Sequence, residues 1–282
     1  MFSLTEILQL AKPIAEQASV LLMEYYQSPQ NIKILPKGLG DVTNADLAVN
    51  EFLLTQLPQV FGRADFAYIS EETADDPQRL NYEWVWVIDP LDGTSGFIQR
   101  DGQFAIHIGL VYRHRPVLGL VAMPAQQQLY WAIAGGGAFV DRAGSIRPIQ
   151  VSERRNLAEM TAIISKSHRT PPMDAVLKLL PKKAEINIGS LGGKWTAIAS
   201  GQADYYITIP ADSAPKDWDF CAPELVLQEA GGKATYFDGS PLQYNRPDLS
   251  QTQPIVASNG HAHAALVELC QKGWQGWQNA NP

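Results

Sequence analysis

The sequence predicts a mixed α/β (α+β) protein with two lobes, residues 1–150 and 151–282. Three observations support this fold class. Apolar residues near the N-terminus follow helical spacing, strand-like runs then follow one another closely to about residue 149, and strands alternate with helices beyond residue 151. The composition agrees, because 45% hydrophobic and 18% charged residues in a chain of 282 are typical of a folded protein with a substantial core.

The first lobe is expected to place two long helices on an antiparallel sheet. Ser3 and Glu6 form a capping box ahead of the first amphipathic segment, and Thr43 with Asp46 leads a second helix that ends near Pro58. Strands are then expected over residues 66–70, 84–89, 104–112, 117–123 and 129–134. Strands this close together, with no helix between them, favour an antiparallel meander.

The second lobe is expected to alternate strands and helices. The predicted strands cover residues 161–165, 185–188, 205–209 and 255–258. One predicted helix begins at Met173, and three more cover residues 194–200, 219–230 and 261–271. The tail from Gly273 to Pro282 is expected to be loosely held. Since no long linker separates the lobes, we expect a site in the cleft between them.

Charge and cysteine content exclude several classes of protein. Lys and Arg number 22 against 29 Asp and Glu, so the net charge is −7, and no basic run could neutralise the phosphates of a nucleic acid. Cys221 and Cys270 are too few for a disulfide framework. No 18 apolar residues run uninterrupted, so no membrane span is expected. These features favour a cytoplasmic protein that binds neither nucleic acid nor membrane.

The segment WVWVIDPLDGT, residues 84–94, carries the strongest chemical signal. An apolar strand here delivers Asp89 and Asp92 at its end, and carboxylate oxygens are ligands that Mg²⁺ prefers. The amides of Gly93, Thr94 and Ser95 could then bind a phosphate. The alternative is an ordinary turn, because turns also use Asp, Pro and Gly. Further acidic pairs at residues 71–72 and 217–219 favour the metal site.

Four motifs together resemble one known family. They are VTNAD (42–46), SEE (70–72), DPLDGT (89–94) and WDFCAPELVLQEAGG (218–232), and the resemblance extends over nearly the whole chain. In this order they resemble the magnesium-dependent, lithium-sensitive phosphatases that include inositol monophosphatases and 3'(2'),5'-bisphosphate nucleotidases. The resemblance implies a layered α-β-α-β-α sandwich of the inositol monophosphatase and fructose-1,6-bisphosphatase type.

The resemblance also implies roles for particular residues and two or three Mg²⁺ ions. The family's metal ligands match Glu71, Asp89, the Leu91 carbonyl, Asp92 and Asp219. Its phosphate site matches Gly93, Thr94 and Ser95, and its water-activating residues match Asp46, Glu71 and Thr94. We expect water to attack phosphorus directly, since two metal ions can generate the nucleophile and neutralise the leaving oxygen.

A different phosphatase class is excluded by one residue. LDGT also resembles the haloacid-dehalogenase-like phosphatases, which need a nucleophilic Asp two positions before the second Asp. That position is Pro90 here, which cannot be a nucleophile. His107 alternates within its strand and is expected to be a hydrogen-bonded sheet or core residue rather than a ligand.

Substrate preference is less strongly indicated. His168, Ser190 and Lys194 match stretches that resemble the bisphosphate nucleotidases, whereas Asp212 matches an acidic residue that contacts inositol in the inositol monophosphatases. The resemblance favours hydrolysis of the 3'-phosphate of adenosine 3',5'-bisphosphate. Inositol monophosphate or another sugar phosphate is the alternative substrate, and a non-catalytic regulatory partner is the alternative class. The resemblance also implies a possible homodimer.

Overall fold

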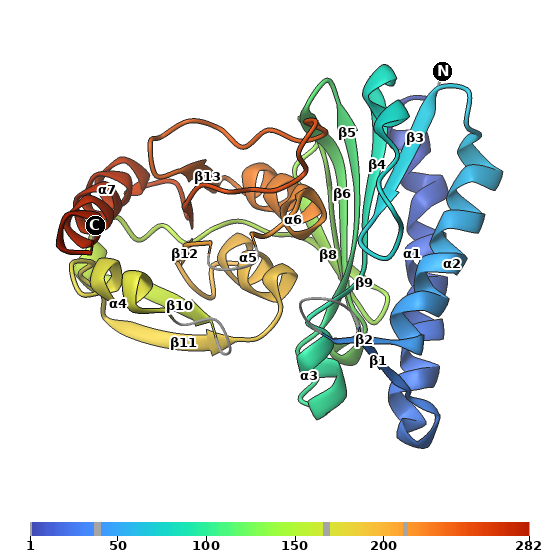
Figure 1. Cartoon of the computed structure of the whole chain (residues 1–282), viewed down its shortest axis with the longest axis horizontal. Coiled ribbons are helices and arrows are strands. Elements are labelled where there is room, and N and C mark those ends of the chain that lie inside the picture. The colour runs from blue at the N-terminus through green and yellow to red at the C-terminus, as the bar shows by residue number, and fades with distance from the viewer. Residues whose placement is uncertain (1, 37–40, 166–169, 211–213, 282) are drawn as a thin grey trace.

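The computed structural model describes residues 2–36, 41–165, 170–210 and 214–281, which form five layers (Figure 1). A pair of helices covers one face of a large sheet, a second pair separates this sheet from a smaller one, and a third pair covers the outer face of the smaller sheet. In that order the pairs are α1 (Leu4–Gln27) with α2 (Asn44–Phe61), α5 (Leu191–Ala199) with α6 (Asp217–Glu229), and α4 (Pro171–Leu177) with α7 (His263–Ala280). The expected α-β-α-β-α sandwich is therefore confirmed.

Both opening helices begin where the sequence places them. The Ser3 and Glu6 side chains complete a capping box at α1, and Thr43 and Asp46 complete another at α2. Each box satisfies backbone N–H groups that the first helical turn leaves without partners. The short strands β1 (Ile34–Pro36) and β2 (Asp41–Thr43) pair just before α2.

The large sheet has seven strands in sequential order. They are β3 (Phe66–Ser70), β4 (Trp84–Asp92), β5 (Ala105–Tyr112), β6 (Arg115–Met123), β7 (Gln128–Ile133), β8 (Ala138–Arg142) and β9 (Ser145–Pro148). The antiparallel prediction is correct from β4 onward but wrong for β3, which pairs with β4 in parallel. The segment between them, which includes the 3-10 turn Pro77–Asn81, returns the chain to the starting edge of the sheet before β4 begins.

The small sheet has five strands in the order β11-β10-β12-β14-β13. Their bounds are Thr161–Ser165 for β10, Ala184–Ile188 for β11, Tyr205–Thr208 for β12, Lys233–Tyr236 for β13 and Ile255–Ser258 for β14. Strand β10 runs parallel to β11 and β12, and β14 runs antiparallel to both of its neighbours.

Helix α6 lies unusually close to the large sheet because two sheet positions lack side chains. A Cβ on Gly109 of β5 would lie 2.4 Å from the Cys221 Sγ atom, and one on Gly119 of β6 would lie 2.6 Å from the Ala222 carbonyl oxygen. Cys221 is fully buried in this contact. The close approach fixes where the N-terminus of α6 lies relative to β4.

The two predicted lobes share a core. The cluster between the sheets combines Val85 and Val87 of β4 with Phe220 of α6 and Tyr236 of β13. A division at residue 150 therefore crosses one continuous set of packed side chains. The division into two lobes, residues 1–150 and 151–282, stays a prediction.

The tail is more ordered than the sequence suggested. Helix α7 continues to Ala280, so the prediction of a loosely held segment from Gly273 is wrong for the residues described. Leu266, Cys270 and Gly273 form one buried face, and a Cβ on Gly273 would lie 3.0 Å from the Cα atom of Val176 in α4. This packing holds the helix past the expected end. None of the helices described is long and apolar enough to cross a membrane.

Candidate active site

The two aspartates predicted to bind metal lie at the C-terminal end of β4, and both are buried. Asp89 is 1% exposed and Asp92 is 8% exposed. Across the ladder, Asp89 lies opposite His107 and Asp92 opposite Ala105, with a register shift between these two pairs. The Leu91 amide donates to Asp89 Oδ1 over 3.0 Å, which holds this carboxylate against its own loop.

The loop after β4 turns sharply at Gly93. Its φ of 89° lies in the left-handed region, and a Cβ there would lie 2.8 Å from the Gln103 carbonyl oxygen, so glycine is required for both reasons. Thr94 begins the short helix α3 (Thr94–Gln99), and Ser95 is exposed beside it. The proposed phosphate-binding amides therefore lie in the first turn of this helix.

Asp46 and Thr94 meet although 48 residues separate them. The Thr94 hydroxyl lies 3.2 Å from Asp46 Oδ1 and 3.3 Å from the Leu91 carbonyl oxygen, and it can donate to one of them at a time. The other carboxylate oxygen of Asp46 accepts from the backbone and hydroxyl of Thr43, over 2.8 and 2.5 Å. Burial raises the pKa of Asp46 despite these hydrogen bonds. A raised pKa suits a group that must accept a proton near neutral pH.

Asp219 and Glu71 add two further carboxylates to this region. Asp219 lies in the first turn of α6, where its Oδ2 atom accepts from the Lys216 amide over 2.6 Å. Burial, and then the charge of Glu71, raises the pKa of Asp219 to about 7. Burial, followed by the charges of Glu71, Asp92 and Asp219, raises the pKa of Asp89 well above its usual value. We call Glu71, Asp89, Asp92 and Asp219 the carboxylate cluster.

The carboxylate cluster suits a hard cation. Mg²⁺ binds oxygen ligands, and all the donors here are carboxylates, with the Leu91 carbonyl oxygen beside them. Among the residues described, no three His, Cys, Asp or Glu side chains are already arranged as a complete metal site. The mutual repulsion that raises the pKa of Asp89 is nevertheless the kind of cost that a bound cation would remove.

His107 lies inside this site, where sequence reasoning did not place it. It is fully buried, and its Nδ1 atom is 3.2 Å from the Trp218 carbonyl oxygen, so Nδ1 carries a proton and donates it. Its Nε2 atom is 3.2 Å from Asp92 Oδ2, and Nδ1 is 3.9 Å from Asp89 Oδ2. The expectation of a hydrogen-bonded sheet residue is confirmed. The missing information was the register of β5 on β4, which puts His107 opposite Asp89.

Helix α5 completes the environment of Asp92. The Gly192 amide donates to Asp92 Oδ2 over 2.7 Å, and a Cβ on Gly192 would lie 2.3 Å from His107 Nε2. Burial acts to raise the pKa of Asp92, but the opposing effects of His107 and Lys194, together with the hydrogen bond from α5, lower it below its usual value. The surroundings therefore favour the charged form of Asp92 and disfavour the charged form of Asp89, on the same loop.

The predicted substrate residues fall into two groups. Ser190 is the N-cap of α5, and its hydroxyl accepts from the Gly193 amide over 2.9 Å. Lys194 is 3% exposed, and its ammonium donates to the Gly189 carbonyl oxygen over 2.8 Å. Both lie next to the carboxylate cluster, and their substrate contacts stay predictions. His168 and Asp212 lie outside the described residues.

Comparison with known proteins gives consistent matches over most of the chain. A model of the inositol monophosphatase family matches residues 3–275. The 3'(2'),5'-bisphosphate nucleotidase CysQ of Aggregatibacter actinomycetemcomitans is 33% identical over 249 residues, which are 86% of this chain and 88% of that protein. The inositol-1-monophosphatase of Bacillus subtilis is 27% identical over 268 residues, covering 94% and 96% of the two chains.

Solved structures agree on the fold. The extragenic suppressor protein suhB of Bartonella henselae superposes with a TM-score of 0.80 at 24% identity, covering 95% of this chain and 99% of that one. The IMPase of Thermotoga maritima superposes with a TM-score of 0.79 at 22% identity, covering 95% and 98%. With the family model and the curated relatives, the chain is a member of the inositol monophosphatase family, whose members are generally magnesium-dependent, and it is a phosphatase.

Proposed function

We propose that this phosphatase removes the 3'-phosphate of adenosine 3',5'-bisphosphate and releases AMP and inorganic phosphate. The observation that favours this substrate is sequence identity. The chain is 33% identical to a relative named as a 3'(2'),5'-bisphosphate nucleotidase and 27% identical to one named as an inositol-1-monophosphatase. The carboxylate cluster and the contact between Asp46 and Thr94 support phosphate ester hydrolysis for either substrate.

Two or three Mg²⁺ ions are the cofactor in this proposal. Glu71, Asp89, Asp92 and Asp219, with the carbonyl oxygen of Leu91, would hold them. Bound magnesium would supply Lewis-acid chemistry, lowering the pKa of water and neutralising charge on the phosphate oxygens. His107 would keep Asp92 oriented, as a partner behind a ligand does in other metal sites.

The chain's own residues then handle the proton of the attacking water. The water oxygen forms a bond to phosphorus while the bond from phosphorus to the ribose 3'-oxygen breaks, and this oxygen takes a proton from solvent water as it leaves. Thr94 would orient the water and pass its proton to Asp46 through the hydrogen bond between them. Asp46 suits this role because burial raises its pKa and Thr43 fixes its other oxygen.

The first turn of α3 would stabilise negative charge on the transferred phosphoryl group. The amides of Gly93, Thr94 and Ser95 lie at this turn, immediately after the carboxylate cluster. Preorganised N–H groups stabilise charge that develops in a transition state without further rearrangement. Ser190 and Lys194 would lie toward the rest of the substrate, together with His168.

Inositol monophosphate hydrolysis is the second candidate. The match to the inositol-1-monophosphatase of Bacillus subtilis is weaker in identity but covers more of the chain, 94% against 86%. Asp212 would contact the inositol hydroxyls in this alternative. An acidic residue there would disfavour a second phosphate on the substrate.

The test is release of phosphate, measured as kcat/KM with Mg²⁺ and again with chelator. The substrates are adenosine 3',5'-bisphosphate, inositol 1-phosphate and fructose 1,6-bisphosphate. We expect metal-dependent release with a strong preference for the adenosine compound. Preference for inositol 1-phosphate would replace the proposal with the second candidate. Absence of metal-dependent release from all three would overturn both.

A further inference from the structure

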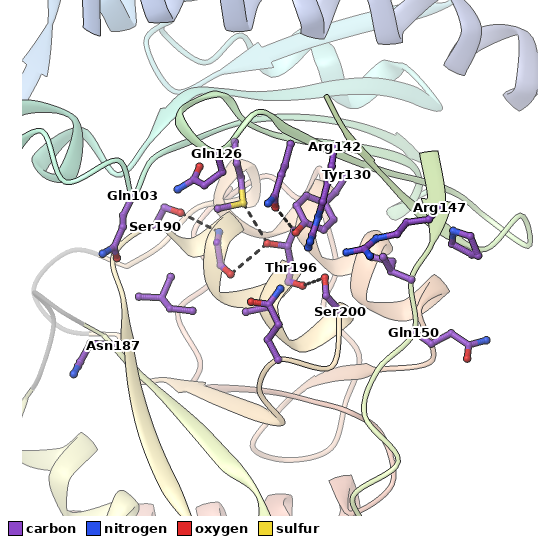
Figure 2. A pocket seen from close by; sticks show the side chains of 18 residues that line it. Gln103, Gln126, Tyr130, Arg142, Arg147, Gln150, Asn187, Ser190, Thr196 and Ser200 are labelled. Atoms are coloured by element: carbon purple, nitrogen blue, oxygen red, sulfur yellow. Dashed lines mark hydrogen bonds between the residues drawn. The ribbon is translucent and has the colours of Figure 1, made fainter. Parts of the chain in front are cut away.

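A cavity of about 690 Å³ runs beside α5, between the outer strands of the large sheet and β11 (Figure 2). One face of α5 forms its floor, with Gly193, Thr196, Ala197 and Ser200 at the spacing of successive helical turns. Gly192, which contacts Asp92, does not line it. The volume is in the range of small-molecule sites and holds a ligand of nucleotide size.

The charges lining this cavity have one sign. Arg142 and Arg147 line it, and no Asp or Glu is among the 18 lining residues, although the whole chain carries a net charge of −7. We call this cavity the arginine pocket. A cavity with positive charge and no carboxylate in an acidic protein selects anions.

The sheet itself aims both guanidinium groups at the cavity. Along β8, Asp141 contacts Lys12 of α1 on one face of the sheet over 3.1 Å, so its neighbour Arg142 faces the other way. Arg147 of β9 pairs directly with Val140, which shares the face of Arg142. The two arginines are therefore diagonal neighbours on one face, where like charges repel.

Neither arginine is neutralised within the part of the chain that the structure describes. Among the described residues, no carboxylate lies within ion-pair distance of either arginine, and the Nε atom of Arg142 is buried without a hydrogen-bond partner. Arg115 and Arg154, in contrast, form ion pairs with Glu224 and Asp204. A buried donor without a partner is costly, so the geometry at Arg142 points to an acceptor that the chain does not supply.

The remaining polar groups fit a ligand that hydrogen-bonds beyond its anionic group. Six carboxamides line the cavity, and those of Gln150, Asn187 and Gln202 make no hydrogen bond within the described residues. Each carboxamide offers donors and an acceptor. All three side chains are exposed at the rim of the cavity, where a sugar or a nucleobase could pair with them.

We propose that the arginine pocket binds a small organic phosphate of nucleotide size, at a site distinct from the carboxylate cluster. The guanidinium groups of Arg142 and Arg147 contact the phosphate, and the free carboxamides contact the sugar or base. Ser190 and Gln103 line the end of the pocket nearest the catalytic loop, since both also contact Gly93. The pocket therefore adjoins the proposed active site without sharing its carboxylates.

Calorimetry with AMP as the probe, in the presence of chelator, tests this proposal. Chelator removes the metal ions on which phosphate binding at the carboxylate cluster would depend. We expect the wild type to bind AMP and to bind adenosine at least tenfold more weakly, because charge-assisted hydrogen bonds to the phosphate are lost. The double variant Arg142→Gln/Arg147→Gln should bind AMP at least tenfold more weakly than the wild type.

Two further variants serve as matched controls. Arg155→Gln removes an exposed arginine paired with Glu153, and AMP affinity should not change. Asp92→Asn alters the carboxylate cluster and should also leave AMP binding in chelator unchanged. Circular dichroism and the melting temperature establish that each variant is folded.

Three outcomes would overturn the proposal. The first is AMP binding that persists unchanged in the folded double variant. The second is AMP affinity that changes, in either direction, in Asp92→Asn, which would place AMP at the carboxylate cluster. The third is no binding by the wild type at millimolar AMP, including the case in which a second copy of the chain covers this face. Phosphatase assays are not part of the readout, so failure here leaves the proposed function standing.

Discussion

The carboxylate cluster and the arginine pocket both contact helix α5, the first through Asp92, and they hold charge of opposite sign. In the first, burial and mutual repulsion raise the pKa values of Asp89 and Asp219. In the second, Arg142 and Arg147 share one face of the sheet with no carboxylate beside them. In each region, like charges are gathered close enough to repel one another.

In both regions the fold places like charges near one another. Elsewhere the chain supplies both partners, as in the ion pair of Arg154 with Asp204. A region in which like charges repel is stabilised when a ligand brings the opposite charge. The comparison therefore predicts that the carboxylate cluster responds to cations and the arginine pocket to anions, each without the other.

The largest effect is expected from neutralising Asp89. Asp89→Asn and, separately, Asp92→Asn should each lower kcat/KM at least about 10³-fold, because losing even one stabilising hydrogen-bond donor typically costs 10²–10³-fold. Asp65→Asn, at an exposed loop position, is the control and should be neutral. Steady-state assays with Mg²⁺ measure the effect. Folded Asp89 and Asp92 variants with near wild-type turnover would disprove the roles proposed for these residues.

A smaller effect is expected at His107. His107→Asn should lower kcat/KM about 10–100-fold and raise the Mg²⁺ concentration needed for half-maximal activity, since a residue that orients a ligand typically contributes that much. The Mg²⁺ midpoint is also measurable from thermal melts without substrate. His114→Asn is the matched control, because His114 also contacts a backbone carbonyl, that of Tyr244 at 2.8 Å, but lies away from the cluster. Equal midpoints in the two variants would mean that His107 is structural only.

Gly192→Ala tests how tightly α5 packs on the cluster. The added methyl would meet His107 Nε2 at 2.3 Å and Val121 Cγ1 at 2.9 Å, so we expect a loss of about 1–3 kcal/mol in the free energy of unfolding. Gly276→Ala in α7 meets nothing within 4 Å and should be neutral or more stable by up to about 1 kcal/mol. Urea unfolding measures both. If both glycines tolerate alanine equally, the contact between α5 and His107 is loose.

The smallest effect separates the two regions directly. Mg²⁺ at about 100 times its Kd should raise the melting temperature of the wild type by about 5 °C relative to chelator. Asp89→Asn should lose most of this rise, whereas Arg142→Gln/Arg147→Gln should keep it. Differential scanning calorimetry provides the comparison. A rise that depends on the arginines would show that the two regions do not act independently.

Local signals in the sequence predicted much of the fold and the acidic motifs. The capping boxes at Ser3 and Thr43 depend on residues three apart, and the apolar strand before Asp89 is continuous, so both are readable from neighbours alone. His107 could not be assigned in this way, because its position follows from the register between β4 and β5.

The arginine pocket was also beyond sequence reasoning. Strand β9 is exposed throughout and lacks the apolar alternation that marks a strand, so Arg147 had no predicted face. The parallel pairing of β3 and the length of α7 depend likewise on packing with distant segments, such as the contact of Gly273 with Val176. Tertiary contacts of this kind have no counterpart in local periodicity.

The register shift in β4 decides whether the side chains of Asp89 and Asp92 lie on the same face of the strand. Three residue steps separate Asp89 from Asp92, whereas only two separate their partners His107 and Ala105 on β5. In a regular strand an odd number of steps sends two side chains to opposite faces, and the one surplus residue restores them to the same face. Inserting one further residue between Pro90 and Leu91, with the bulge kept, would therefore leave both aspartates in the sequence yet turn Asp92 away from Asp89. The number of residues between the two aspartates is therefore as important for the site as their identity.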